Sequence, residues 1–336
     1  MLKVGIVGMG IRGNLYAETV KHNPHAEVIA VSESDESRLK DSAKSYRVKT
    51  YTDFRDMLGK ERFDLAIVAL PDHLHKDAVI AAAQKGCHLL IEKPLATSSE
   101  DAQQMVQTIK KAGIKALVGF ENRWNPAFIS AKEAIDSGEI GDVRILFTCL
   151  NDSIFVPTQM LGWAARSTPA WFLFPHTIDM TLWLTGKKVK RVYGRGVKKV
   201  LKEMGIDTFD SISAIVEFTD GTSGTYNTCW IYPESIPLVY DLRFDFVGSK
   251  GAISVDLRDQ MIHKMTTTYS HPPTLGKPIH GKPLGFAAEM LNCFIDNIRL
   301  NTEPLVDIED GLYVVEVIDR IHRSIETGKI EPMEEK

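Results

Sequence analysis

The sequence lacks the features that mark several large classes of protein. Its 44 acidic residues outnumber its 40 basic ones, and a net charge of −4 is not the basic footprint of a nucleic-acid-binding protein. No apolar run approaches the roughly 20 residues that a membrane-spanning helix needs. Internal repeats and low-complexity tracts are also absent from the sequence. We therefore expect neither a nucleic-acid partner nor insertion into a membrane.

Cysteine is scarce as well. The four cysteines, Cys87, Cys149, Cys229 and Cys293, are scattered and form no Cys-x-x-Cys pair. This pattern favours buried or incidental thiols in a reducing cytoplasm over a disulfide framework, with a catalytic thiol as a minor alternative. Residues Leu2–Val7 already have the composition of a first strand. We therefore expect no signal peptide before the fold and a cytoplasmic location.

The first third of the chain alternates between two hydrophobic patterns. At 336 residues the chain is long for a single core, so two domains are expected. Short, mostly branched apolar runs predict buried parallel strands at Val4–Val7, Val28–Val31, Leu65–Ala69, His88–Ile91 and Ala116–Val118. Helical spacing between them predicts helices at Asn14–His22, Glu36–Ser45, Lys76–Lys85 and Ser99–Ala112, with Ser98, Ser99 and Asp101 near the last helix start. This alternation predicts an α/β Rossmann domain with a parallel sheet over residues 1–122.

The rest of the chain, residues 123–336, is expected to form an α+β domain. After one or two helices, strand patterns at Ser213–Phe218 and Gly224–Ile231 flank an Asp-Gly turn, which is a strong hairpin signal. A second hairpin and a further strand are predicted at Arg243–Val247, Ala252–Asp256 and Met261–Thr267. A loop over Tyr269–Pro283 then leads to helices at Phe286–Arg299 and Ile308–Thr327. We expect a large, open, mainly antiparallel sheet, and packing of the final helices back on the Rossmann domain stays open.

A glycine-rich turn follows the first predicted strand and opens the first predicted helix. Its residues are Gly8, Met9, Gly10, Ile11, Arg12 and Gly13. In this context the three glycines serve the tight turn, the approach of backbone to a pyrophosphate, and close helix–strand packing. The helix N-terminus offers N–H groups to the phosphates. The segment therefore predicts a dinucleotide site.

Glu33 lies twenty positions beyond Gly13, at the end of the second predicted strand. A carboxylate at this place accepts hydrogen bonds from the adenosine ribose and repels a 2′-phosphate, so NAD is expected rather than NADP. Arg38 either contacts the adenosine end or lies on a solvated helix face.

The next motif, Glu92-Lys93-Pro94, ends a buried strand. Ligands of open parallel sheets bind beyond the carboxyl ends of strands, so Lys93 is expected at the cofactor crevice.

Together these motifs resemble the Gfo/Idh/MocA family of oxidoreductases, and the resemblance continues along most of the chain. Segments that are similar to the family's follow in order at residues 70–75, 119–126, 138–143, 176–179 and 289–328. The resemblance implies hydride transfer between a nicotinamide and a hydroxyl or carbonyl group of a sugar, inositol or related polyol. It implies that Lys93 contacts the reacting oxygen, that His176 exchanges the proton, and that the Lys93–Pro94 bond is cis.

The resemblance also implies further site residues. Those expected near the cofactor are Leu70, Pro71, His73, His75, Glu92 and Asn122, and those expected near the substrate are Arg123, Trp163, Arg166, Phe172 and Asp179. His73 and His75 are spaced like a metal pair, but no Cys or carboxylate cluster accompanies them, so no metal is expected. His176 follows Pro175, and we expect a helix to start there, with Asp179 on the same helical face.

One departure from the family concerns the chemistry. The family commonly has an Asp four residues before this His and a Gly two before it, where this chain has Phe172 and Phe174. The phenylalanines leave two alternatives open: a reductase of a less polar carbonyl or enone, and a dinucleotide-sensing regulator without turnover. With the acid missing and the positive Lys93 expected nearby, we expect His176 to be neutral at pH 7.

The second domain is also expected to mediate self-association. Its strands alternate in polarity, so one face of the sheet should pack on helices and the other should be free. The aromatic and branched residues of Tyr226–Ile231 and Phe244–Val247 are expected to supply apolar area on the free face. Such an exposed patch predicts a homodimer or homotetramer through this sheet.

Overall fold

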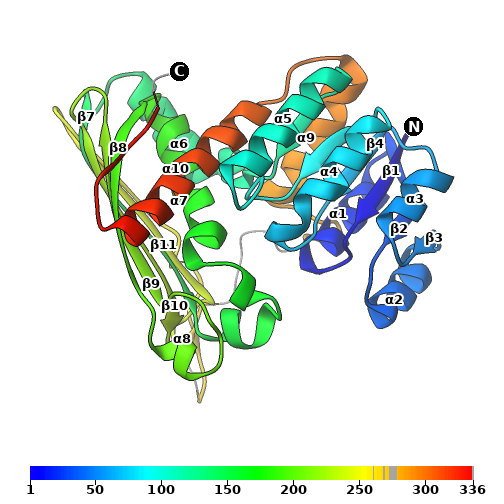
Figure 1. Cartoon of the computed structure of the whole chain (residues 1–336), viewed down its shortest axis with the longest axis horizontal. Coiled ribbons are helices and arrows are strands. Elements are labelled where there is room, and N and C mark those ends of the chain that lie inside the picture. The colour runs from blue at the N-terminus through cyan, green and yellow to red at the C-terminus, as the bar shows by residue number, and fades with distance from the viewer. Residues whose placement is uncertain (260, 268, 272–277, 335–336) are drawn as a thin grey trace. The chain divides into compact units, whose positions relative to one another are not determined.

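A computed structural model describes residues 1–259, 261–267, 269–271 and 278–334 (Figure 1). The chain forms two compact units, one of Met1–Glu121 with Gly276–Val315 and the other of Asn122–Leu275 with Glu316–Lys336. The first unit thus takes in α9 (Phe286–Leu300), which packs against α1 (Ile11–His22). Asn23, at the end of α1, donates a hydrogen bond from Nδ2 to Asn292 Oδ1 at 2.9 Å. No helix in these described ranges is both long and apolar enough to cross a membrane.

The first unit is built on a six-stranded sheet in which every pair is parallel. The strand order is β3 (Lys49–Tyr51), β2 (Ala26–Ser32), β1 (Leu2–Val7), β4 (Leu65–Val68), β5 (His88–Ile91) and β6 (Ala116–Val118). The predicted parallel sheet is confirmed, and β5 and β6 have the predicted bounds. Sequence patterns did not predict β3 or α3 (Phe54–Lys60), since β3 has one exposed and two partly buried residues and forms no apolar run.

The connecting helices are α1, α2 (Glu36–Tyr46), α4 (His75–Gln84) and α5 (Ser99–Ala112), with a 3₁₀ turn η1 (Asp72–Leu74) before α4. Helix α5 begins because the Ser98 hydroxyl accepts a hydrogen bond from the Asp101 N–H. It ends at Gly113, which adopts the left-handed conformation at φ +65°. The order of the strands reverses between β1 and β4, which is where open parallel sheets bind their ligands.

The second unit contains a seven-stranded mixed sheet. The order is β12 (Ala252–Asp256), β11 (Tyr240–Gly248), β7 (Val143–Ser153), β10 (Ser223–Tyr232), β9 (Ser211–Phe218), β8 (Val189–Val197) and β15 (Glu331–Pro332). Only the β7–β10 pair is parallel among these strands, so the expected mainly antiparallel sheet and its two hairpins are confirmed. The sequence analysis did not identify β7, β8 or β15.

Helices and a short strand pair complete the second unit. Helices α6 (Pro126–Asp136), α7 (Pro169–Thr185) and α8 (Val200–Glu203) join its strands, and α10 (Ile308–Thr327) runs from the first unit into the second. The strand predicted at Met261–Thr267 was too long, because only β13 (Lys264–Met265) forms, paired with β14 (Tyr269–Ser270). Within the loop predicted at Tyr269–Pro283, residues 272–277 lie outside the described residues.

The two faces of the seven-stranded sheet differ from our expectation. Helix α7 packs on β7, β9 and β10, and Phe174 contacts Tyr226 edge-on with ring centroids 6.3 Å apart. Tyr226, Trp230, Phe244 and Phe246 therefore lie in the core, and assigning them to the free face was wrong. Because side chains alternate along a strand, the opposite face carries their neighbours. Its partly exposed apolar residues are Ile145, Phe147, Ile215 and Val247.

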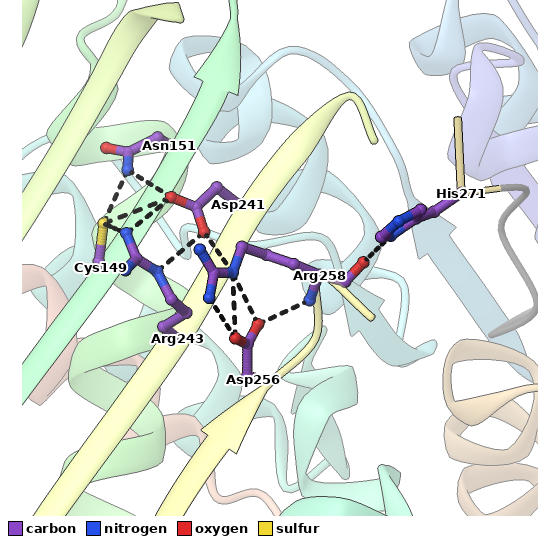
Figure 2. A network of polar contacts seen from close by, with 7 residues as sticks. All are labelled: Cys149, Asn151, Asp241, Arg243, Asp256, Arg258 and His271. Carbon is purple, nitrogen blue, oxygen red and sulfur yellow. Dashed lines mark hydrogen bonds and ion pairs between the residues drawn. The ribbon is translucent and has the colours of Figure 1, made fainter. Parts of the chain in front are cut away.

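A polar network covers part of this open face (Figure 2). Asn151 of β7 donates from Nδ2 to Asp241 Oδ2 of β11 at 3.2 Å, and Arg243 Nη2 lies 2.9 Å from the same oxygen. Cys149 lies within this network, and burial together with the Asp241 carboxylate raises the pKa of its thiol. A raised pKa disfavours the thiolate, so Cys149 does not have the character of a catalytic nucleophile.

Candidate active site

The glycine-rich turn between β1 and α1 has the shape that a dinucleotide requires. Gly8 has φ +92°, and a side chain on Gly13 would overlap the Gly8 carbonyl, so both positions need glycine. A Cβ on Gly10, in contrast, would meet no atom within 4 Å, which leaves this backbone open to a pyrophosphate. No side chain caps the N-terminus of α1 at Gly10. The turn therefore fits the phosphates of a dinucleotide, with the helix dipole favouring negative charge.

Glu33 follows β2 and is held beside this turn. Its Oε2 accepts a hydrogen bond from the Met9 N–H at 2.9 Å, and its Oε1 accepts from the Asp35 N–H at 3.0 Å. The residue is 8% exposed, so its carboxylate has a fixed place. Arg38 is largely exposed on α2, with Nη1 3.8 Å from Glu33 Oε2. Both alternatives for Arg38 remain compatible with this position.

We expect this fixed carboxylate to select NAD(H) over NADP(H). Replacing Glu33 with Ala should weaken NADH binding by roughly 1–3 kcal/mol, the cost of losing charge-assisted hydrogen bonds. Titration of each variant with NADH and NADPH measures the effect. Glu36→Ala, which removes an exposed carboxylate from the same region, is the matched control. Tighter binding of NADPH than of NADH by the unmodified protein would contradict the prediction.

Lys93 lies directly after β5, at the carboxyl end of the parallel sheet. The expected cis bond to Pro94 is confirmed. The Lys93 N–H donates to Glu92 Oε2 at 3.2 Å. Burial lowers the pKa of the Lys93 ammonium below its ordinary value, while the carboxylates of Glu92 and Glu121 oppose that change. The site thus contains a desolvated amine close to negative charge, as a group that stabilises a developing oxyanion would be.

Arg12 points from the glycine-rich turn toward these same carboxylates. Its Nε lies 3.2 Å from Glu92 Oε1, and its Nη2 forms an ion pair with Glu121. Tyr16, one turn further along α1, donates to Glu92 Oε1 at 2.5 Å, and burial raises the pKa of its hydroxyl. The sequence analysis missed Tyr16 and Glu121. Tyr16 is fully buried, so its spacing resembles that of an ordinary core residue.

The loop after β4 holds the predicted residues Leu70, Pro71, His73 and His75. His75 is 1% exposed, and its ring nitrogens lie 2.8 Å from the Pro94 carbonyl and 2.9 Å from the Leu70 carbonyl. Its side chain therefore braces this loop against the Lys93–Pro94 turn, and its expected place beside the cofactor stays a prediction. His73 Nδ1 lies 3.4 Å from Asp72 Oδ1. In the part of the chain that the structure describes, no three His, Cys, Asp or Glu side chains group in a way that could hold a metal.

His176 belongs to the second unit, in the middle of α7. The expected helix start at Pro175 was wrong, because α7 begins at Pro169, where the Thr168 hydroxyl accepts from the Trp171 N–H at 3.2 Å. Pro175 instead lies inside the helix, where it cannot donate the usual backbone hydrogen bond. Most of α7 is buried, but His176 and Phe172 are only partly buried. The amide Nδ2 of Asn122 lies 3.4 Å from His176 Nδ1.

Arg123 and Asp179 form a buried ion pair. Their guanidinium and carboxylate groups meet at 2.6 Å and 3.2 Å, and the side chains are 5% and 1% exposed. The Arg123 guanidinium also lies over the Trp183 ring, 5.9 Å from its centroid. The pair ties the segment after β6 to α7, and contact of either residue with substrate stays a prediction.

Aromatic rings surround the position at which the family commonly has an acid. The Phe172 ring centroid lies 6.0 Å from that of Trp163 and 5.8 Å from that of Trp230. Trp230 is fully buried, and its indole N–H has no hydrogen-bond partner among the residues that the structure describes. Arg166, in the 3₁₀ helix η4 (Ala164–Arg166), is exposed. Sequence patterns did not single out Trp230, because nothing in the local pattern shows which face of β10 meets Phe172.

The first unit combines a parallel sheet, a glycine-rich turn that suits a dinucleotide, a buried carboxylate beside that turn and a lysine at the end of a strand. These features define the class of dinucleotide-dependent oxidoreductases. Comparison with family models agrees with this assignment. Residues 2–120 match the oxidoreductase family with an NAD-binding Rossmann fold, and residues 128–254 match the GFO/IDH/MocA C-terminal domain. The chain therefore belongs to the Gfo/Idh/MocA family and is an NAD-dependent dehydrogenase. The resemblance seen in the sequence is confirmed, and family membership disfavours a purely sensory role.

Individual relatives match along much or all of the chain. A myo-inositol 2-dehydrogenase of Thermotoga maritima is 26% identical over 99% of both chains. The scyllo-inositol 2-dehydrogenase (NAD(+)) of Bacillus subtilis is 25% identical over 78% of this chain and 76% of its own. Among solved structures, the scyllo-inositol dehydrogenase of Lactobacillus casei with bound NAD(H) and scyllo-inositol covers 99% of both chains at a TM-score of 0.85 and 21% identity. At that identity the last comparison establishes the fold alone.

Proposed function

We propose that this protein oxidises a secondary hydroxyl group of a cyclic polyol of the inositol type, or of a sugar, and catalyses the reverse reduction. The observation that carries the proposal is the position of Lys93 directly after β5, at the carboxyl end of the parallel sheet and in the same unit as the dinucleotide turn. The inositol dehydrogenases among the relatives support the substrate class.

Two residues divide the chemistry in this proposal. NAD, when bound, supplies the acceptor for the hydride that leaves the carbon atom. Lys93 donates a hydrogen bond to the substrate oxygen and stabilises its developing negative charge. His176 takes the hydroxyl proton, because a neutral imidazole is an effective base near neutral pH. Asn122 Nδ2 lies 3.4 Å from His176 Nδ1, and this contact helps to orient the imidazole ring.

The aromatic group of Trp163, Phe172 and Trp230 favours a second candidate. These rings stand where an Asp at position 172 would offer a polar group to the substrate. Binding against them costs a less polar carbonyl compound or enone less free energy of desolvation than it costs a polyol. The same rings also suit the C–H face of a sugar or inositol ring. The second candidate therefore differs from the first only in the polarity of the substrate.

A paired substrate screen tests the two candidates. Inositols, sugars and amino sugars are offered with NAD, and cyclic ketones and enones are offered with NADH, while absorbance at the nicotinamide band reports turnover. The proposal predicts turnover of at least one polyol or sugar. Turnover of ketones or enones alone would replace it with the second candidate. Phe172→Asp should raise activity on polyols relative to ketones, since it restores a hydrogen-bond acceptor.

The open face of the seven-stranded sheet supports a proposal of self-association, as a homodimer or homotetramer. Ile215 of β9 and Phe147 of β7 are 53% and 44% exposed there. Burial of such apolar area drives association. We also propose a cytoplasmic location, which the absence of disulfides among the four cysteines supports.

Self-association gives a direct prediction. The protein should be a dimer or tetramer by light scattering at micromolar concentration, and Phe147→Glu together with Ile215→Glu should yield a smaller species because buried charge is costly. Leu300→Glu, at an exposed apolar residue of the first unit, is the control and should leave the mass unchanged. A monomeric unmodified protein would count against the proposal.

A further inference from the structure

Arg12 occupies a place in the sequence that is typical of a phosphate ligand, but its side chain has a different environment. It is the fifth residue of the glycine-rich turn, at the start of α1. Its guanidinium nevertheless contacts the carboxylates of Glu92, at the end of β5, and Glu121, after β6. Although burial alone would lower the pKa of Arg12, the two carboxylates raise it above its ordinary value. The Arg12 side chain is 31% exposed, and its cation is paired with two carboxylates of the first unit.

Glu92 joins this cation to the backbone of Lys93. Its Oε1 receives the Tyr16 hydroxyl and lies 3.2 Å from Arg12 Nε, while its Oε2 accepts the Lys93 N–H. Arg12 and Tyr16 of α1 thus both contact Oε1 of Glu92, and Oε2 of Glu92 contacts the backbone of Lys93. The carboxylate is 5% exposed, so water does not compete strongly for these contacts.

We propose that Arg12 and Glu92 are positioning residues for Lys93, linking the dinucleotide turn to the lysine and setting the charge around its ammonium. The inference rests on the proposed function, in which Lys93 stabilises the reacting oxygen. The effect of Arg12 and Glu92 on the titration of Lys93 can nevertheless be measured without substrate or cofactor.

The charged groups around Lys93 determine the direction in which each substitution should shift its pKa. Within the first unit these are Arg12 on α1, Glu92 at its own strand end, Glu121 after β6 and Asp72 in η1. The neutral Tyr16 hydroxyl donates its hydrogen bond to Glu92. Loss of the Arg12 cation removes a like charge and stabilises the ammonium, whereas loss of the Glu92 anion does the opposite. The two substitutions should therefore move the titration of Lys93 in opposite directions.

Competitive labelling of the full chain with acetic anhydride measures this titration. Only the neutral amine reacts, so the labelling rate of the Lys93 peptide, followed by mass spectrometry at fixed pH, reports its neutral fraction. Arg12→Met should slow labelling and Glu92→Gln should accelerate it, each by roughly three- to tenfold, the effect of one neighbouring charge. Lys21→Met removes an exposed cation from the same helix and should leave the rate unchanged. Arg12→Lys retains the charge and should stay close to the unmodified protein.

Binding and turnover separate this role from the alternatives. As a positioning residue, Arg12→Met should change the dissociation constant of NADH less than about threefold but lower kcat, with Arg12→Lys recovering part of the loss. Tenfold weaker NADH binding with unchanged Lys93 labelling would overturn the inference and make Arg12 a phosphate ligand. Labelling that shifts in the same direction in Arg12→Met and Glu92→Gln would also overturn it, as would an Arg12→Lys protein that matches Arg12→Met. If no polyol is turned over but the labelling rates shift as expected, the proposed function fails and this inference stands.

Discussion

Replacing Lys93 with methionine is expected to remove most turnover and to leave a folded protein that binds NADH. Methionine retains the length and apolar stem of the side chain but cannot donate to the substrate oxygen. Removal of one donor to a developing oxyanion costs roughly 10²–10³-fold in kcat. Steady-state kinetics on the substrate found in the screen measures the loss, and NADH titration with a thermal melt checks binding and folding.

The pH dependence of the unmodified protein gives an independent check on Lys93. A lysine that acts as an ammonium is active below its pKa and loses its effect as the pH rises through that value. Because burial lowers the pKa of Lys93, the alkaline limb of kcat should lie below the range of an ordinary lysine, about 10.4. Lys85→Met, at an exposed lysine of the same unit, should change neither kcat nor the limb. Near-normal turnover in Lys93→Met would exclude Lys93 as the catalytic group.

Sequence patterns predicted the first unit well because its determinants are local. The glycines of the dinucleotide turn, the apolar runs of β1, β4 and β5, and the Ser98 cap each depend on a few neighbouring residues. The family motif at Lys93 likewise lies where a predicted strand ends. Local patterns missed β3, which lies at the sheet edge and has one exposed and two partly buried residues.

The second unit was harder to predict because its determinants are distant in sequence. The face to which Phe244 and Trp230 belong depends on the register of β11 and β10 against β7, about a hundred residues away in the first case.

The contacts of Arg12 in the first unit also depend on a residue that is distant in sequence, because its partner Glu121 lies 109 positions further along the chain. No pattern around Arg12 distinguishes a phosphate ligand from an internal counter-ion, so only the folded arrangement could show that it faces two carboxylates.

His176 is the residue that we expect to exchange the proton, and its removal should have the second large effect. Asparagine keeps hydrogen-bonding capacity near the position of the imidazole but cannot act as a base at neutral pH. His176→Asn should therefore lower the rate of oxidation by roughly 10²–10⁴-fold, the usual contribution of a general base. His25→Asn, at an exposed histidine of the first unit, is the control and should retain full activity.

The pH profile identifies the role of His176 more specifically than the loss of rate. A base must be neutral to accept a proton, so oxidation in the unmodified protein should rise with pH through an acidic limb, which His176→Asn should flatten. Phe172→Asp, which places a carboxylate one helical turn before His176, should move that limb to higher pH because a neighbouring negative charge stabilises the imidazolium. If His176→Asn retains both its turnover and its acidic limb, the proton acceptor is another residue. A limb that stays in place in Phe172→Asp while disappearing in His176→Asn would show that the Asp side chain does not face the ring.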